Sequence, residues 1–280
     1  MVAIVPSPEE AVAGILDGAT VMIGGFGPAG QPVELISALV GLGATGLTVV
    51  SNNAGNGDVG LAALIGAGRV RKMVCSYPRQ PDSWQFDRKY RDGEIELELV
   101  PQGNLAERIR AAGAGIGGYY APTGYGTPLA EGKETRLIDG RHYLLEYPLR
   151  ADFALVKVYQ ADELGNLVYR KTARNFGPIM ATAAATTIVQ VEEVVAVGSL
   201  DPESIITPCI YTDRVVRVPV PARAFEPVGA ASEHEGRRAG PAQAGTSLLR
   251  RSHPVSVRWK SVRLRIITGR TATSAASKMA

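Results

Sequence analysis

Residues 17–32 read D-G-A-T-V-M-I-G-G-F-G-P-A-G-Q-P, an apolar run followed at once by a glycine-rich turn. The apolar run, Thr20 to Ile23, is rich in β-branched residues and predicts a buried strand. Pro32 suits the first turn of a helix, and apolar residues keep helical spacing from Leu35 to Leu42. Together these parts predict an anion site, because free amide groups and the helix dipole would both point at the ligand.

Four glycines shape this turn, and because they have no Cβ they allow a tight bend with uncovered amide groups. They are Gly24, Gly25, Gly27 and Gly30, of which the last three satisfy the dinucleotide fingerprint G-x-G-x-x-G. That fingerprint also needs an acidic residue about 20 positions further on. No Asp or Glu occurs between Leu35 and Gly57. A nicotinamide-binding oxidoreductase domain is therefore a disfavoured alternative, and a purely structural tight turn is a second one.

The whole chain of 280 residues is long enough for one large domain or two small ones. Its first twenty residues carry no Lys or Arg, which is not the pattern of a signal peptide. No run of about 18 apolar residues occurs, so we expect no membrane span. The only cysteines, Cys75 and Cys209, are too few for a disulfide framework and favour a reducing cytoplasm.

The net charge of +3 hides an uneven distribution. Residues 221–280 hold eleven basic and three acidic side chains, a balance of +8, whereas residues 1–220 have a balance of −5. We expect a domain over residues 1–220 and a disordered basic tail over residues 221–280. The tail holds His234 and His253 without partners at metal spacing, so no metal site is predicted. A basic stretch around Trp259 resembles a nucleic-acid patch, but without a fold to present it we expect no nucleic-acid binding.

Alternating strand and helix patterns predict an α/β fold with an open, mainly parallel sheet flanked by helices. The expected strands after the glycine turn are Leu47–Val50, Lys72–Cys75, Glu94–Val100, Tyr143–Glu146, Phe153–Tyr159 and Thr187–Val197. The expected helices span residues 60–67, 84–90 and 179–185, with further helices from Pro8 to about Asp17 and from Asn104 onward.

Helix starts carry capping signals. Ser7, Pro8 and Glu10 form a capping box, and Leu16 would belong to the apolar stripe of that first helix. Asn104 would cap the later helix, with Glu107 at the third position.

Two polar features have competing interpretations. Glu94, Glu96 and Glu98 alternate with apolar residues, which favours a wet face of a strand over a pair of acid/base carboxylates. The glycine-rich residues 113–132 predict either a functional loop or an irregular exposed connection.

Five blocks of the chain occur in order between about residues 8 and 218. They are the 17–32 segment, Ser51–Gly55, Pro101–Arg110, Pro122–Thr127 and Glu131–Arg136. Together these blocks resemble the family I coenzyme A (CoA) transferases, and within them the alpha (A) subunit of the two-subunit 3-oxoacid enzymes. Residues 75–83 look more like the 3-oxoadipate enzyme than the acetoacetate enzyme, which stays the close alternative.

The resemblance implies ping-pong transfer of CoA from succinyl-CoA to a 3-oxoacid through a glutamyl-CoA thioester on the enzyme. It places the nucleophilic Glu in a Ser-Glu-Asn-Gly motif of a beta subunit, in a heterodimer or α2β2 assembly. The nearest string in this chain, Ser232 to Gly236, lies in the tail and lacks the Asn. The CoA thioester would be a substrate, and no permanently bound cofactor is implied.

The family match also gives roles to individual residues. It implies that Asn52 donates to the oxyanion and that Gln102 helps to orient the acyl group. The CoA-contacting segment would be Gly24, Gly25, Phe26, Gly27, Pro28, Ala29 and Gly30. Since both acids are dicarboxylates, a cation must meet the remote carboxylate, and our hypothesis for it is Arg79.

Two departures from the family pattern stand out. Cys209 replaces a usual Gly, and a positive φ there would be strained by a side chain. The tail from about Val220 has no counterpart in the family; a regulatory binding module that uses it is a third class of function, whose binding would disappear with the tail.

Overall fold

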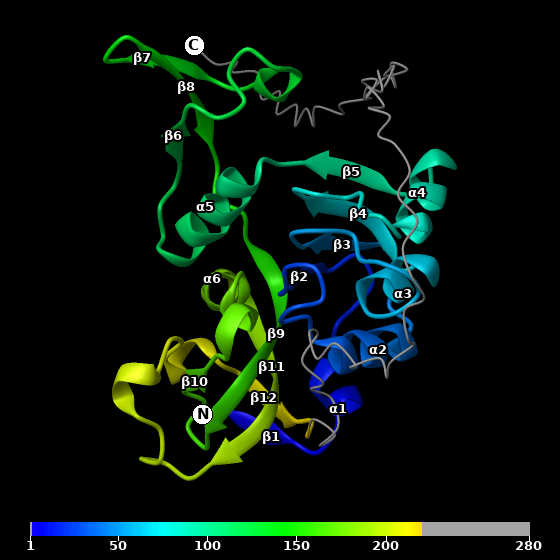
Figure 1. Ribbon diagram of the computed structural model, residues 1–280, viewed down its shortest axis with the longest axis vertical. Coiled ribbons are helices and arrows are strands. Elements are labelled where there is room, and N and C mark those ends of the chain that lie inside the picture. The colour runs from blue at the N-terminus through cyan, green and yellow to red at the C-terminus, as the bar shows by residue number, and fades with distance from the viewer. Residues whose placement is uncertain (1, 220–280) are drawn as a thin grey trace, which may run out of the picture. The chain divides into compact units, whose positions relative to one another are not determined.

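A computed structural model of the chain describes residues 2–219 (Figure 1). The predictions for the basic tail, including its two histidines, the segment around Trp259 and the string from Ser232 to Gly236, lie outside the described residues.

The main sheet is open and mainly parallel, as predicted. Its strands run in the order β1-β12-β11-β9-β2-β3-β4-β5, and β10 is added antiparallel to β9. Every other neighbouring pair is parallel. The strands are β1 (Ala3–Val5), β2 (Thr20–Ile23), β3 (Leu47–Val50), β4 (Val70–Cys75), β5 (Glu96–Leu99), β9 (Ala151–Asp162), β10 (Leu167–Val168), β11 (Ala184–Val195) and β12 (Arg214–Arg217).

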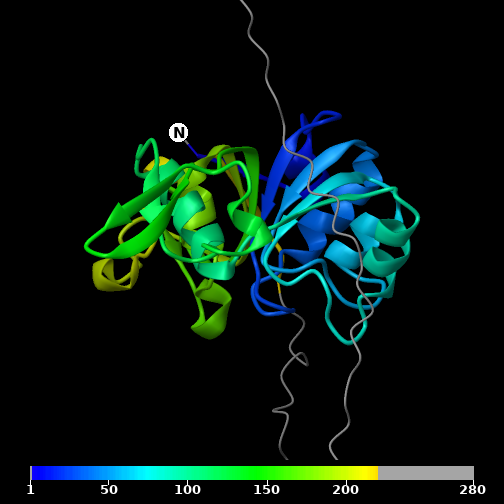
Figure 2. The same ribbon diagram turned by 90° about the horizontal axis from the view of Figure 1, so that it is seen from above.

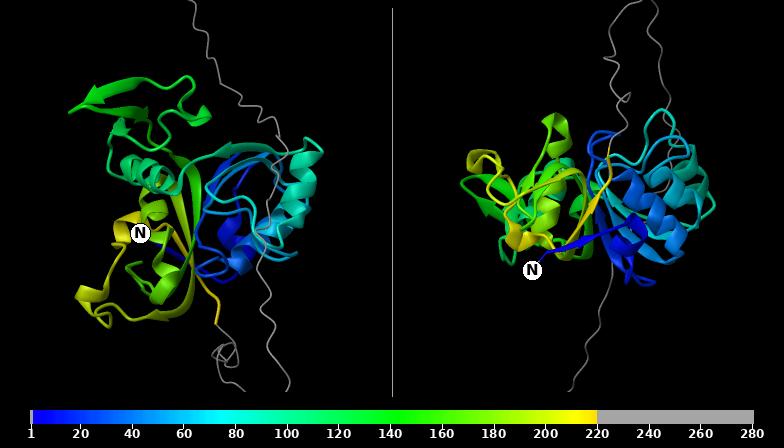
Figure 3. Two further views of the ribbon diagram at one scale, coloured as in Figure 1. Left: turned by 45° about the horizontal axis from the view of Figure 1, so that its top comes forward. Right: turned by 90° about the horizontal axis from the view of Figure 1, so that it is seen from below.

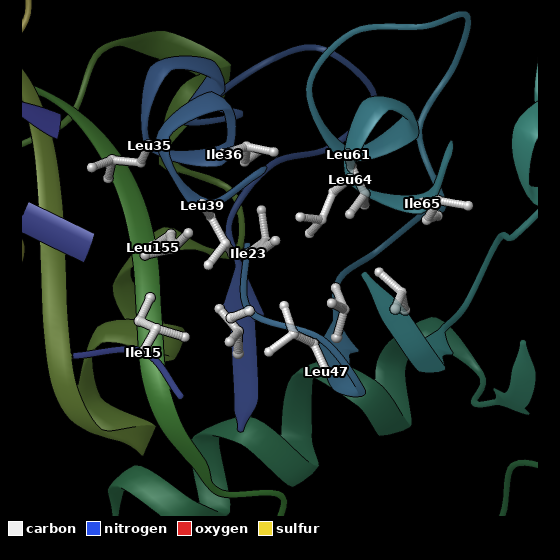
Figure 4. Packing of buried hydrophobic residues seen from close by; sticks show 14 of the residues in the cluster. Ile15, Ile23, Leu35, Ile36, Leu39, Leu47, Leu61, Leu64, Ile65 and Leu155 are labelled. Carbon is white, nitrogen blue, oxygen red and sulfur yellow. The ribbon is translucent and has the colours of Figure 1, made fainter. Parts of the chain in front are cut away.

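Helices cover both faces of this sheet (Figures 2 and 3). They are α1 (Pro8–Val12), α2 (Val33–Leu42), α3 (Leu61–Gly66), α4 (Trp84–Arg91), α5 (Gln102–Gly113) and α6 (Gly177–Ala183). Because side chains alternate along a strand, Val21 and Ile23 of β2 pack under α1 to α4 while Met22 packs under α5 and α6. Figure 4 shows the first cluster, in which leucines and isoleucines of α2 and α3 lie over Ile23 and Leu47. Strands buried on both faces explain why their sequences are short continuous apolar runs.

A second, three-stranded antiparallel sheet was not predicted. It has the order β6-β8-β7 and consists of β6 (Tyr119–Ala121), β7 (Thr135–Ile138) and β8 (Arg141–Glu146). Figure 1 shows the β7–β8 hairpin extending away from the main sheet. Asp139 and Gly140 both have positive φ, 46° and 76°, as a tight primed turn requires. The glycine-rich residues 113–132 are therefore partly regular, since they include β6 and a one-turn 3-10 helix at Pro128–Ala130.

Two predicted helix ends are wrong. Ser7 does cap α1, since its Oγ accepts from the Glu10 amide at 3.2 Å. The helix stops at Val12, however, because Gly14 turns the chain at φ 93°, and Leu16 is exposed. Helix α5 begins at Gln102, after Pro101, so Asn104 is not its cap. The Asn104 carboxamide instead donates to the buried carboxylate of Glu146 at 2.9 Å.

The three glutamates of the β5 region form a charged face, which agrees with the wet-face interpretation. Strand β5 is an edge strand, and Glu94 and Glu96 are exposed. Glu98 is half-buried and pairs with Lys72 at 2.6 Å and Arg108 at 2.9 Å. Burial alone would raise the pKa of Glu98, but the hydrogen bonds and charges of these two cations outweigh it and lower the pKa. An ionised, paired carboxylate of this kind is a structural group rather than a proton carrier.

The expected strain at Cys209 is absent. Among the described residues only Asp139 and Lys171 combine a side chain with a positive φ. Cys209 begins a one-turn 3-10 helix, and its amide donates to Asn166 Oδ1 at 3.0 Å. A β-carbon is tolerated there because this turn uses an ordinary negative φ.

Gly55→Ala is expected to cost about 3 kcal/mol of the free energy of unfolding, from the left-handed backbone plus the crowding of a packed region. Gly55 has φ 79°, and a Cβ would lie 2.5 Å from the Ala62 amide nitrogen of α3. The matched control is Gly115→Ala, where φ is 71° and no atom lies within 4 Å, so the expected cost is about 1 kcal/mol. Urea unfolding of both variants checks this. Equal losses would show that the Ala62 contact has no effect.

Candidate functional site

The candidate site lies where four neighbouring parallel strands end. The glycine loop, residues 24–30, follows β2, and Asn52 follows β3. Residues 76–83 follow β4, and Gln102 follows β5. The carboxyl ends of parallel strands meet at one edge of the sheet, which is where open α/β proteins bind ligands.

The glycine loop is a tight turn that leaves several amides unused. The amides and carbonyls of Phe26 and Ala29 exchange hydrogen bonds at 3.0 and 3.2 Å, and the turn between them has Gly27 at φ 57°. Gly25 and Gly30 also have positive φ, 129° and 77°. Within residues 2–219 nothing accepts from the amides of Gly25, Gly27 and Gly30. Phe26, which lies in this turn, is 51% exposed.

The N-terminus of α2, by contrast, is partly occupied by contacts within the protein. The Leu35 amide donates to the buried Gln190 side chain at 3.4 Å, and the Val33 amide donates to the Gln31 carbonyl at 3.0 Å. Gln190 in turn donates to the Glu34 carboxylate. This negative charge at the helix start already complements the dipole. These contacts occupy the amides of Val33 and Leu35, so the loop amides are the better candidates for the ligand, and the use of the helix dipole stays a prediction.

Asn52 and Gln102 are brought together although fifty residues separate them. Gln102 Nε2 donates to Asn52 Oδ1 at 2.7 Å. The Asn52 main chain is held as well, because its carbonyl accepts from the amides of Ser76 at 3.2 Å and Tyr77 at 3.0 Å. Asn52 is only 2% exposed, so this carboxamide is held rigidly.

The bond from Gln102 leaves Asn52 Nδ2 as an open donor. No described residue accepts from this atom. It is also not enclosed: within residues 2–219 the enclosed side-chain atoms without a partner are Arg69 Nε, Ser76 Oγ and Thr212 Oγ1. An amide donor that faces out of a rigid, buried position is suited to an oxyanion.

A pocket of about 260 Å³ is lined by Gln102, the partner of Asn52. Its lining is mostly apolar and contains no charged side chain: Phe26, Gln102, Gly103, Ala106, Asn175, Phe176 and Ile179. The glycine loop and Gln102 therefore share one pocket. A neutral chain fits this lining better than a carboxylate, since a buried charge without a partner is costly.

Asn175 and Phe176 are among the pocket residues for which no role was predicted. They follow the 3-10 turn Lys171–Arg174 and lead into α6. Asn175 Nδ2 donates to the Ala29 carbonyl of the glycine loop at 2.9 Å. The local signal was an Asn two residues before Gly-Pro at a helix start, and nothing in it indicates contact with residue 29, 146 positions away.

Arg79 does not line this pocket. Its Nε pairs with Asp87 Oδ1 of α4 at 2.8 Å, and the Arg79 side chain is 57% exposed. An exposed pair of this kind contributes about 0–1 kcal/mol, so the guanidinium can leave it at little cost.

Cys75 lies at the end of β4 but is not a nucleophile. Burial raises the pKa of its thiol to about 12, although a hydrogen bond from the Tyr77 amide acts in the opposite direction. Both cysteines are free thiols. Among residues 2–219 no three His, Cys, Asp or Glu side chains are grouped to hold a metal ion, and none of the helices there could cross a membrane.

Comparison with known proteins places this site in context. The model of the coenzyme A transferase family matches residues 5–218. The chain is 67% identical to the A-subunit of 3-oxoadipate CoA-transferase from Pseudomonas putida, over 76% of this chain and 92% of that protein. It is 51% identical to the A-subunit of succinyl-CoA:3-ketoacid coenzyme A transferase from Xanthomonas campestris pv. campestris strain B100, over 78% and 90%. A crystal structure of an acyl-CoA transferase from Escherichia coli O157:H7 superposes with a TM-score of 0.69 at 23% identity, over 78% of this chain and 47% of that one.

Proposed function

The chain belongs to the coenzyme A transferase family, and we propose that it is the alpha subunit of a two-subunit enzyme that moves CoA from succinyl-CoA to 3-oxoadipate. The observation that carries this proposal is the bond to Asn52 Oδ1 from Gln102, a residue that lines the pocket; this bond leaves Asn52 Nδ2 without a partner in the described residues. The two relatives named as A-subunits support the need for a second subunit.

The proposed chemistry has two balanced halves. The carboxylate of a beta-subunit glutamate attacks the carbonyl of succinyl-CoA and expels the CoA thiolate, which gives a mixed anhydride. The thiolate then attacks the glutamyl carbonyl, which forms the enzyme thioester and releases succinate. The carboxylate of 3-oxoadipate attacks this thioester in the same two steps, which gives the CoA thioester of 3-oxoadipate and restores the free glutamate. In each half a carboxylate attacks a thioester carbonyl, so negative charge develops on its oxygen. Asn52 Nδ2 donates to that oxygen, and one such donor is worth about 3 kcal/mol.

The other described residues bind and orient. The unpartnered amides of the loop 24–30 contact the CoA thioester, and Phe26 packs against the uncharged part of the CoA molecule next to that thioester. Gln102 holds the carboxamide of Asn52 and borders the acyl group. CoA is a substrate here, and the proposal includes no permanently bound cofactor. Two free cysteines agree with the cytoplasm as the proposed location.

The substrate assignment is tested with the chain co-expressed with its beta subunit. Turnover with succinyl-CoA and 3-oxoadipate, and a much lower kcat/KM with acetoacetate, is the expected result. The second candidate, transfer to acetoacetate, has support from the 51% identical relative. Preference for acetoacetate would show that the acceptor acid is acetoacetate rather than 3-oxoadipate. An intact complex that transfers no CoA would overturn the proposed function.

Arg79→Ala is expected to raise the KM for 3-oxoadipate about tenfold, because a charged hydrogen bond to a carboxylate is worth about 1.5–3 kcal/mol. The matched control is Arg88→Ala on α4, whose cation lies over Trp84 and bonds to Gln85. It should leave that KM unchanged. Steady-state kinetics with each substrate varied in turn gives the KM for 3-oxoadipate and for succinyl-CoA in both variants. A higher KM for succinyl-CoA alone would show that Arg79 serves CoA rather than the acid.

Deletion of residues 225–280 is expected to leave assembly and activity intact, because the family pattern ends near residue 218. Gel filtration of the complex and the transfer assay check this. A complex that fails to form, or a large fall in kcat, would give the tail a role and favour a binding module.

A further inference from the structure

The segment that precedes α6, residues 171–176, is hydrogen-bonded to the glycine loop, residues 24–30. Asn175 Nδ2 donates to the Ala29 carbonyl at 2.9 Å and to the Thr172 carbonyl at 2.7 Å. Asn175 Oδ1 accepts from the Phe176 amide at 2.7 Å. The amide nitrogen and the oxygen of the Asn175 carboxamide therefore both have partners, and one of these bonds reaches the glycine loop.

The two segments touch at the level of the main chain. A Cβ on Gly30 would lie 2.7 Å from the carbonyl oxygen of Ala173, so only glycine permits the approach. The segment itself is anchored, because Phe176 is buried in the core below and Met180 of α6 is fully buried. The loop is therefore held against a rigid element rather than against another loop.

The contact fixes one particular peptide group. The Ala29 carbonyl and the Gly30 amide belong to the same planar trans peptide, in which C=O and N–H point in opposite directions. Holding the carbonyl of Ala29 therefore fixes the direction of the Gly30 N–H. That amide is one of the three loop donors without a partner in the described part of the chain.

We propose that Asn175 is a positioning residue, which sets the Ala29–Gly30 peptide so that the glycine loop binds the CoA thioester. This inference rests on the proposed function and adds a residue to its machinery. Asn175 donates to the loop from 146 residues away and also borders the pocket.

The test compares Asn175→Ala and Asn175→Asp with a matched control in the assembled enzyme. The control is Asn166→Ala, since Asn166 also ties main chain together, through the Cys209 amide, but borders no part of the pocket. Loss of the three side-chain hydrogen bonds in Asn175→Ala, one of them to the loop, should raise the KM for succinyl-CoA about tenfold and leave kcat within about twofold. Asn175→Asp should raise it further, because its carboxylate faces two carbonyl oxygens. The Asn166 variant should lower the unfolding midpoint without changing that KM.

Amide hydrogen exchange of residues 24–31 gives a readout that needs no turnover. The amides of Phe26 and Ala29, which are hydrogen-bonded to each other's carbonyls, should exchange about tenfold faster in Asn175→Ala, because the local opening equilibrium shifts by that factor, and at an unchanged rate in Asn166→Ala. An inactive wild-type complex would count against the proposed function. Unchanged exchange in the Asn175 variants would instead overturn the inference that Asn175 holds the glycine loop. Faster exchange with an unchanged KM for succinyl-CoA would also overturn the inference, because the loop would then be held for a reason other than CoA.

Discussion

Asn52→Ala should lower kcat of the assembled enzyme by about 10²–10³, the usual loss when one oxyanion donor is removed. The KM values should change little, because the donor acts when charge develops rather than when the ground state binds. Asn52 is buried and its main chain is bound by Ser76 and Tyr77, so the alanine variant keeps the backbone in place.

The control for this variant is Asn56→Ala, in the same loop but exposed. It should keep kcat within about threefold of the wild type, since surface substitutions away from special features are usually near neutral. If both variants lost kcat equally, the effect would belong to the loop and not to the Asn52 donor.

Gln102→Glu is the second large change expected, with a fall in kcat of about 10²-fold. The introduced carboxylate is only an acceptor, so it would repel Asn52 Oδ1 and turn the carboxamide until Nδ2 donates to it. The donor would then be withdrawn from the substrate. Gln102→Leu removes the bond without this reversal and should lower kcat about fivefold, because one hydrogen bond is worth about 1 kcal/mol.

A double-mutant cycle distinguishes orientation of Asn52 from independent roles. If Gln102 acts through Asn52, Gln102→Leu should have almost no further effect in an Asn52→Ala background. Additive losses would instead show that Gln102 contacts the acyl group by itself.

The fold was predictable where the local signal was strong. The apolar runs at β2 and β3 and the helices α3 and α4 lie within two residues of the sequence prediction, because glycine or polar clusters bound them. The predictions missed β1 and β12, which pair with each other from opposite ends of the described residues. Their pairing depends on tertiary contacts that no local pattern encodes. The β7–β8 hairpin had a usable signal, Asp139-Gly140 between alternating residues, and this signal was overlooked.

The site was predictable only in part, and for a physical reason. That Asn52 and Gln102 follow strands could be inferred from the residues, while their roles came from the family resemblance. Their hydrogen bond depends on the order of β3, β4 and β5 in the sheet. The same holds for Gln190, which closes the start of α2 from 155 residues away, and this contact occupies one amide of the helix start.

The central claim is that this chain supplies the oxyanion donor and the beta subunit supplies the nucleophile. Its most direct test is the intact mass of both subunits after the complex is incubated with succinyl-CoA without an acceptor acid. We expect CoA to be attached to the beta subunit and not to this chain, with the adduct forming at least tenfold more slowly in the Asn52→Ala complex. A thioester on this chain, or an adduct that forms at the same rate without Asn52, would contradict the account.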